Sequence, residues 1–305
     1  MDIVEATLAL YDIEWRLGPA RAVALDTLTV ATSQGRPASG TYLVANQMRV
    51  DSTANGWRAT TDGGAVLTGT ANGYGESWQL VVPGRLVETE RWSEVEDLLT
   101  VVLTVGWRRA GWVPIHAGGI TTRERGVLVC AGSMGGKTTF TLAMVRRGWQ
   151  TLGDDKLLLG ERGGLPIIGA AKHTLNVDPA VAAWFPELRG IAELPPYSAW
   201  TPKRRVRLAA HWPQAVAYEM TPSHVLVLER TALPGHELIV GELDRSETIG
   251  ALLRQSVIPR DHEAARSSAG ALGRLAEKTT GLRVQVPDGV FSRPGALDAL
   301  ERALQ

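Results

Sequence analysis

The segment Ala131–Thr139, with the sequence AGSMGGKTT, is the most informative part of the chain. It follows the short apolar run Val127–Cys130 and precedes the helix-like run Phe140–Val145. A strand, a glycine-rich turn, Lys-Thr and a helix is the arrangement that wraps backbone N–H groups around phosphates. The lysine then reaches the outer phosphates, and the threonine hydroxyl can hold Mg²⁺. We therefore predict a nucleotide-phosphate site at this segment.

The residues predicted to surround the phosphates form the turn and the start of the helix. They are Gly132, Ser133, Met134, Gly135, Gly136, Lys137, Thr138 and Thr139. The usual pattern opens with glycine, and here that position is Ala131.

Composition excludes several classes of protein. The chain has 305 residues, enough for one large domain or two modest ones. Lys+Arg and Asp+Glu both number 32, so no overall charge attracts nucleic acid or anionic membrane. Cys130 is the only cysteine, which excludes an intrachain disulfide and a cysteine-rich zinc site. The acidic N-terminus lacks the positive charge of a secretory signal, and the longest apolar run, Leu98–Trp107, is too short to span a bilayer. We expect a soluble, cytoplasmic protein.

Residues 1–92 predict a β-rich domain. Short, often alternating apolar segments are separated by Asn-Gly and Gly-Gly turns, which favours an antiparallel layer. The predicted strands are Tyr42–Val44, Gln47–Val50, Gly56–Thr60, Ala65–Thr68 and Ser77–Val82.

Residues 93–305 are predicted to form the nucleotide-binding domain. It opens with a helix for which Ser93 is the expected N-cap and Glu96 completes a capping box. Val113–Ile120 is expected as a strand that forms a hairpin with the strand before the glycine-rich turn. The following helix should run from Lys137 to Arg147 and stop at Gly148. Further expected elements are a strand over Gln150–Gly160, a strand pair of His224–Leu228 and Glu237–Val240, helices over Ser246–Gln255 and Asp261–Lys278, a strand over Leu282–Val286, and a helix over Pro294–Leu304.

Two adjacent carboxylates, Asp154 and Asp155, come in the strand after the helix, which could lie beside the strand of the glycine-rich turn. Phosphoryl transfer needs a phosphate cradle, a metal and a carboxylate that orients or deprotonates the acceptor hydroxyl. Adjacent residues of a strand point to opposite faces, so these two carboxylates are expected to have different tasks. One can face Mg²⁺ while the other acts as a general base.

Three segments together resemble the core of HPr-kinase-like proteins. They are His116–Ile120 (HAGGI), Val127–Thr138 (VLVCAGSMGGKT) and Gly148–Asp155 (GWQTLGDD). That family pairs a strand histidine, a P-loop with serine at its third position and an Asp-Asp after the helix. Its nucleotide fold is similar to that of phosphoenolpyruvate carboxykinase. The resemblance covers residues 113–160, and more loosely the region to 305. It implies an α/β P-loop kinase domain, here preceded by the β-rich domain.

The resemblance also implies roles for individual residues. Lys137 would neutralise the β- and γ-phosphates, and Thr138 would ligate Mg²⁺. Asp154 would be the catalytic base and Asp155 would lie near the metal. His116 would sit close to the transferred phosphate.

The chain also departs from the family pattern. The family P-loop usually carries glycine where this chain has Ala131 and Met134; if the latter position needs a positive φ, methionine is strained there. HPr kinases also carry a second sequence signature well after the Asp-Asp pair, and this chain has no true counterpart of it. Glu161–Ile168 contains some of the same residue types, but it follows Asp155 almost directly and predicts a hairpin turn. We therefore expect a divergent relative with a substrate of its own.

The densest basic cluster is Lys203–Arg207. It could contact phosphate or an acidic peptide, but a solvated strand edge is the commoner explanation for such a cluster.

The function expected from these features is transfer of the γ-phosphate of ATP, with Mg²⁺, to a hydroxyl. The acceptor would be a serine of a protein or peptide. Because relatives in this divergent group modify peptide natural-product precursors, the resemblance implies such a precursor as a candidate acceptor. Two alternatives stay open: a small-molecule hydroxyl such as a free amino acid or metabolite, and a non-catalytic nucleotide-binding regulatory or scaffold protein. ATP and GTP are not distinguished, no nucleic-acid or membrane partner is expected, and a homo-oligomer is suggested only by the family.

Overall fold

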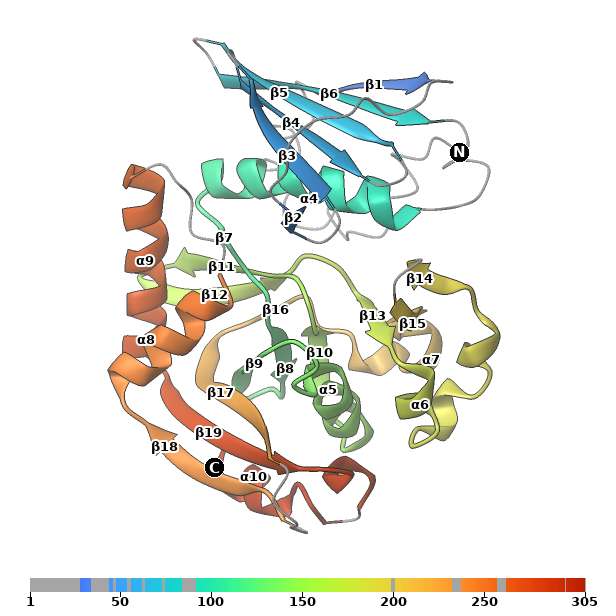
Figure 1. The fold of residues 1–305 in the computed structure, drawn as a ribbon. Helices are drawn as coiled ribbons and strands as arrows, with labels where there is room; N and C mark the ends of the chain where they lie inside the picture. The colour runs from blue at the N-terminus through green and yellow to red at the C-terminus, as the bar shows by residue number, and fades with distance from the viewer. Residues whose placement is uncertain are drawn as a thin grey trace. The chain divides into compact units, whose positions relative to one another are not determined.

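The computed structural model describes residues 28–33, 44–45, 48–53, 56–61, 64–72, 75–83, 92–198, 201–231, 237–256, 262–293 and 295–304. The chain has a mixed α/β fold with several sheets and divides into two compact units, Met1–Gly111 and Trp112–Gln305 (Figure 1). The division falls after helix α4 (Trp92–Arg109). The boundary expected from the sequence, between residues 92 and 93, lies in the first turn of that helix.

The first unit contains a six-stranded sheet in the order β1-β6-β5-β4-β3-β2. Its strands are β1 (Leu28–Ser33), β2 (Val44–Ala45), β3 (Met48–Thr53), β4 (Gly56–Thr61), β5 (Val66–Asn72) and β6 (Gly75–Pro83). The strands from β2 to β6 form an antiparallel meander, which confirms the predicted layer, although Tyr42, Leu43 and Gln47 lie outside the described residues. Strand β1, which was not expected, pairs in parallel with β6.

Helix α4 follows this sheet in the first unit. Its buried residues Leu99, Leu103 and Trp107 recur every four positions and so form one apolar face. Because the helix already begins at Trp92, Ser93 lies inside its first turn, and the expected N-cap at Ser93 is wrong.

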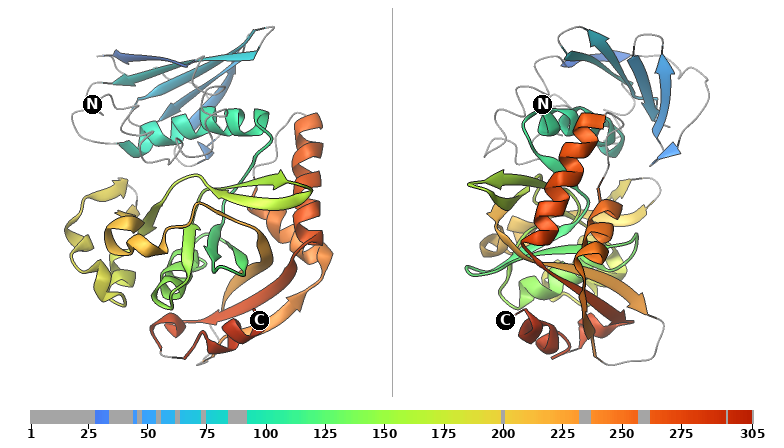
Figure 2. Two further views of the ribbon diagram at one scale, coloured as in Figure 1. Left: turned by 180° about the vertical axis from the view of Figure 1, so that it is seen from behind. Right: turned by 90° about the vertical axis from the view of Figure 1, so that its left-hand side faces the viewer.

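The second unit, which Figure 2 shows from two further sides, is built around a six-stranded sheet. The order of its strands is β10-β8-β9-β17-β19-β18. Its strands are β8 (Gly118–Thr121), β9 (Gly126–Ala131), β10 (Gln150–Gly153), β17 (Pro222–Thr231), β18 (Ile239–Leu243) and β19 (Thr280–Pro287). Strands β9, β17 and β19 are parallel, and the three outer strands run antiparallel to their neighbours.

Strand β9 is buried along its whole length, as expected for a parallel strand covered on both faces. Its residues Val127 and Val129 share a core with Phe140 and Leu142 of helix α5 (Lys137–Arg146). The alternate residues Leu128 and Cys130 belong to a second core. That core includes Leu252 of helix α8 (Arg245–Arg254) and Leu272 and Leu275 of helix α9 (His262–Glu277). The sheet is therefore packed between α5 on one face and α8 with α9 on the other.

Two smaller sheets complete this unit. One has the order β16-β12-β11-β7, with β7 (Val113–Ile115), β11 (Leu157–Arg162), β12 (Leu165–Ala170) and β16 (Glu219–Met220). The other has the order β13-β15-β14, with β13 (Thr174–Val177), β14 (Pro196–Ser198) and β15 (Thr201–Arg207). The remaining elements are α6 (Pro179–Ala182), η1 (Pro186–Leu188), η2 (Ile191–Glu193), α7 (Leu208–His211), η3 (Pro213–Ala215), η4 (Val290–Ser292) and α10 (Asp298–Ala303).

The chain crosses between the four-stranded and the six-stranded sheet at two adjacent places. One crossing, at His116 and Ala117, connects β7 to β8; the other, at residues 154–156, connects β10 to β11. Because β7 pairs with β11 and β8 pairs with β10, the two crossings lie side by side. The expected single strands over residues 113–120 and 150–160 are wrong, since each is two strands in two sheets. The second segment also lies beside β8 instead of beside the strand of the glycine-rich turn.

Several local expectations are confirmed. The hairpin of β8 and β9 forms, and α5 ends at Arg146, two residues before Gly148, which has a φ of 91°. Residues 161–168 form a hairpin of β11 and β12, with Gly163 and Gly164 in its turn. The expected pair of strands near residues 224 and 240 is wrong, because β19 lies between β17 and β18. The closing helix is shorter than expected, covering Asp298–Ala303. Among the described residues, no helix has the length and apolar character needed to cross a membrane.

We predict that the start of β9 tolerates no side chain at Gly126. A Cβ there would lie 3.0 Å from the carbonyl carbon of Thr221 and closer still to its oxygen, both of which are backbone atoms. Gly126→Ala should therefore lower the free energy of unfolding by about 1–3 kcal/mol. The control is Gly273→Ala in α9, where a Cβ meets no atom within 4 Å and helix propensity should add up to about 1 kcal/mol. Chemical denaturation measures both, and equal stabilities for the two variants would contradict the predicted packing.

Candidate functional site

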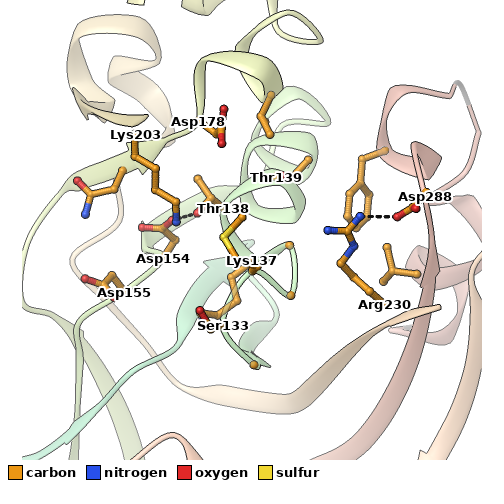
Figure 3. A pocket seen from close by; sticks show the side chains of 18 of the residues that line it. Ser133, Lys137, Thr138, Thr139, Asp154, Asp155, Asp178, Lys203, Arg230 and Asp288 are labelled. Atoms are coloured by element: carbon orange, nitrogen blue, oxygen red, sulfur yellow. Dashed lines mark hydrogen bonds and ion pairs between the residues drawn. The ribbon is translucent and has the colours of Figure 1, made fainter. Parts of the chain in front are cut away.

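A pocket of about 310 Å³ opens over the glycine-rich turn, where the parallel strands end (Figure 3). It is lined by the turn itself and by three further walls. These comprise residues 132–139; His116, Asp154 and Asp155; Asn176, Asp178, Val181, Trp184 and Lys203; and Arg230, Val286, Pro287, Asp288, Gly289 and Phe291. All residues that the sequence placed at the site thus line one pocket.

Two positions of the glycine-rich turn favour glycine, Gly135 because a side chain has no room there and Gly136 because of its backbone conformation. A Cβ on Gly135 would lie 2.8 Å from the Cβ of Ala131 and 2.9 Å from the carbonyl oxygen of Gly132. Gly136 has a φ of 91° and caps α5. Met134, with a φ of 59°, is the one described residue other than glycine with a positive φ. The strain expected for methionine at this position is therefore present.

Ala131 ends β9 in the ladder with Leu228, is buried, and has no positive φ. The absence of the usual glycine thus introduces no backbone strain.

The start of α5 supplies positive charge to the pocket. The first N–H groups of a helix have no partner within the helix and carry the positive end of its dipole, and here no acidic residue occupies the first turn. Lys137 Nζ donates a hydrogen bond to the carbonyl oxygen of Ala131 at 2.9 Å. Burial lowers the pKa of Lys137, because it removes water from around the ammonium group. An anion that contacted the ammonium would replace this lost solvation and would be bound favourably.

Thr138 joins α5 to the bend that contains the two carboxylates. Its hydroxyl donates a hydrogen bond to Asp154 Oδ2. Asp154 is only 5% exposed, and its second oxygen, Oδ1, is buried and accepts no hydrogen bond from the residues that the structure describes. Burial, reinforced by the charge of Asp155, raises the pKa of Asp154 to about 6. An ion that contacted this buried oxygen would therefore recover part of the free energy that its burial costs.

Thr138 and Asp154 fit the ligand chemistry of Mg²⁺. Magnesium is usually held by one or two protein oxygens together with substrate phosphates, not by a complete protein cage. Within the described part of the chain, no three His, Cys, Asp or Glu side chains gather into such a cage. The unpartnered Oδ1 of Asp154 and the hydroxyl of Thr138 are oxygen ligands of the kind that Mg²⁺ takes.

Asp155 has different partners. Its Oδ1 lies 2.8 Å from His116 Nδ1, and its Oδ2 lies 3.7 Å from Nζ of Lys172, whose side chain is 2% exposed. Burial alone would raise the pKa of Asp155, but the hydrogen bond with His116 and the charge of Lys172 hold it well below its usual range. Asp155 is therefore a permanently ionised partner of His116, whose side chain is 57% exposed.

The two carboxylates thus differ in surroundings, although they lie in a bend and not in a strand. Asp154 accepts a hydrogen bond from Thr138, and Asp155 pairs with His116. The resemblance suggested the other arrangement, with Asp155 near the metal and Asp154 as the base.

Lys203 is a pocket residue whose place the sequence did not reveal. It lies in β15, the middle strand of its sheet, so the interpretation of residues 203–207 as a solvated strand edge is wrong. The density of basic residues was its only sequence signal. Asn176, Asp178, Trp184 and Arg230 also line the pocket and belong to no motif.

The wall formed by the ends of β17 and β19 combines an ion pair with apolar surface. Arg230 and Asp288 form the ion pair, and Val286 and Pro287 lie beside it. Phe291 packs edge-on against Phe140, with ring centroids 5.8 Å apart.

The sequence matches no protein-family model and no curated protein. Its structure is similar to that of the Hpr(Ser) kinase/phosphatase from Coxiella burnetii, with 14% sequence identity and a TM-score of 0.35. The similarity covers 62% of this chain and 94% of the other. At this distance, the similarity says nothing about what the chain binds or does.

We predict that Asp154→Asn stabilises the ligand-free protein at high pH. The folded-state pKa of Asp154, about 6, lies above its ordinary value of 3.8, so the fold favours the protonated form and loses stability as the pH rises through this interval. Asparagine keeps an acceptor for Thr138 without the charge. With a chelator present, the variant should be more stable by about 1–3 kcal/mol at pH 8, and this gain should vanish near pH 4. A gain that does not depend on pH in denaturant titrations would contradict the burial argument.

A second prediction concerns the strain at Met134. Met134→Gly should raise the free energy of unfolding by about 1 kcal/mol, because glycine adopts the left-handed conformation without a steric penalty. Ser133→Gly is the matched control, since Ser133 has no positive φ, and it should lower the stability instead. Thermal unfolding of both variants distinguishes them; a stability loss in both would show that Met134 is not strained.

Proposed function

We propose that residues 112–305 form a kinase related to the HPr kinases, which transfers the γ-phosphate of a magnesium-bound nucleoside triphosphate to a hydroxyl. The observation that carries this proposal is the hydrogen bond from Thr138 to Asp154 over a glycine-rich turn, directly beside the pair of His116 and Asp155. The residues proposed as phosphate cradle, metal ligands and acid–base pair line one pocket, which supports the proposal.

The phosphates are held by the turn and by Lys137. Backbone N–H groups at the start of α5 face negative charge favourably. Lys137, which rests on the carbonyl oxygen of Ala131, is placed to turn its ammonium to the outer phosphate oxygens. Its partial burial strengthens that attraction, because the site excludes part of the competing water.

Thr138 and Asp154 would hold Mg²⁺. The ion would neutralise charge on the β- and γ-phosphates and fix their orientation. The roles proposed for the two carboxylates are thus the reverse of those that the resemblance suggested: Asp154 serves the metal, and Asp155 serves the acceptor.

Asp155 and His116 would activate the acceptor. With Nδ1 of His116 held by Asp155, the other ring nitrogen, Nε2, is free to take the proton of the acceptor hydroxyl. The acceptor oxygen then bonds to the γ-phosphorus, the bond from that phosphorus to the bridging oxygen breaks, and the nucleoside diphosphate leaves. Asp155 stays ionised and stabilises the protonated imidazole.

The acceptor we propose is a serine hydroxyl of a protein or peptide. His116 is more than half exposed, so a bulky acceptor can reach it without entering the pocket completely. A small hydroxyl metabolite would be phosphorylated by the same residues. ATP is the proposed donor, although Arg230, Asp288 and Phe291 offer contacts to either purine.

A second candidate is a nucleotide-binding module without transfer. The strained backbone of Met134, at the tip of the turn, is the observation that favours it. Both candidates require nucleotide binding, and only the kinase requires the pair of His116 and Asp155.

The prediction that separates them uses γ-labelled ATP, Mg²⁺ and a panel of serine peptides and hydroxyl metabolites. Asp155→Asn should lower the transfer rate on the order of 10²–10⁴-fold with little change in Mg-ATP affinity, because it removes the orientation of His116. Asp154→Asn should weaken Mg²⁺-dependent binding itself. Glu263→Gln, an exposed change in the first turn of α9, is the control that should alter neither.

Tight binding of Mg-ATP without label transfer to any acceptor would favour the binding module. Transfer that survives in Asp155→Asn would contradict the role assigned to that carboxylate.

A further inference from the structure

A second lysine faces the phosphate site from the wall opposite the glycine-rich turn. Lys203 lies on β15, within the inserted three-stranded sheet, and its side chain reaches down toward Asp154 and Thr138 (Figure 3). Lys137 approaches the same place from the start of α5. The site therefore lies between two ammonium groups that come from different elements.

The electrostatics of the pocket agree with this placement. Lys203 acts electrostatically on both Asp154 and Lys137, because its positive charge opposes the rise in the pKa of Asp154 and adds to the fall in the pKa of Lys137. Both groups lie where the phosphates would bind, so the positive charge of Lys203 would attract phosphate oxygens at that position.

Lys203 lacks an ion pair with any described residue, although its side chain is partly buried. The other basic residues of its neighbourhood are engaged: Arg230 pairs with Asp288, Arg204 donates to the carbonyl oxygen of Pro202, and Arg205 lies over the ring of Tyr197. A partly buried ammonium without a direct ion pair is stabilised when a ligand brings an opposite charge into contact with it. In this pocket, that ligand is an anion placed over the turn.

We propose that Lys203 is a catalytic residue that contacts the γ-phosphate from the side opposite Lys137 and stabilises the charge that develops during transfer. The inference rests on the proposed function. Lys203 keeps its proton throughout and forms no covalent bond; it acts as a fixed cation at the oxygens of the transferred group.

A purely structural role predicts different behaviour. If Lys203 only balanced the charges of Asp154 and Asp155, its loss would lower stability and would weaken the binding of ATP and ADP equally. A γ-phosphate contact instead distinguishes ATP from ADP, because ADP lacks the group that Lys203 touches.

The test uses the full chain with Lys203→Met, Lys203→Arg and the control Lys278→Met, an exposed lysine next to the end of α9. Calorimetric titration with Mg-ATP and Mg-ADP measures the affinities, and label transfer measures kcat and KM. Lys203→Met should weaken ATP binding about tenfold while ADP affinity stays within about twofold, and kcat should fall on the order of 10²-fold. Lys203→Arg should recover part of both losses, and Lys278→Met should match the unmodified chain.

Equal losses for ATP and ADP, or no loss in kcat, would overturn the proposal for Lys203 and leave the kinase assignment intact. If the unmodified chain binds ATP but transfers no label, the kinase assignment and the catalytic role of Lys203 both fail. A selective loss of ATP affinity in Lys203→Met would then still support the γ-phosphate contact.

Discussion

The hydrogen bond from Thr138 to Asp154 connects the parts on which the site depends. Thr138 belongs to the first turn of α5, and Asp154 belongs to the bend where the chain leaves the six-stranded sheet. His116 lies at the neighbouring crossing, so holding Asp154 also positions Asp155 beside the histidine. The chain crosses between two sheets at two adjacent places, and these crossings bring the side chains of the site together.

The two neighbouring carboxylates are separated by their surroundings. Asp154 is buried with one unpartnered oxygen, and its pKa rises to about 6; Asp155 has a histidine and a buried lysine, and its pKa falls. A pair of acids pushed in opposite directions is typical of sites that divide a reaction between them. This difference supports assigning the metal to Asp154 and the acceptor to Asp155.

Much of the fold near the turn could be predicted because its signals are local. The segment around Lys137, the hairpin before it and the strain at Met134 follow from glycine, lysine and apolar spacing within about twenty residues. The crossings at His116 and Asp154 could not be predicted, because an apolar run does not show which sheet each half joins. Lys203 was misassigned for the same reason: its strand becomes the middle of a sheet through pairing with residues 174–177, far away in the sequence.

The measurement that tests the central claim most directly is a crystal structure of the chain with Mg²⁺ and a non-hydrolysable nucleoside triphosphate. We expect phosphates over residues 132–138, with the metal ion between Thr138, Asp154 and the β- and γ-phosphates. His116 and Asp155 should then face the side of the γ-phosphorus opposite the bridging oxygen. A nucleotide bound elsewhere, or a metal ion held by Asp155 and His116 with Asp154 uninvolved, would contradict it.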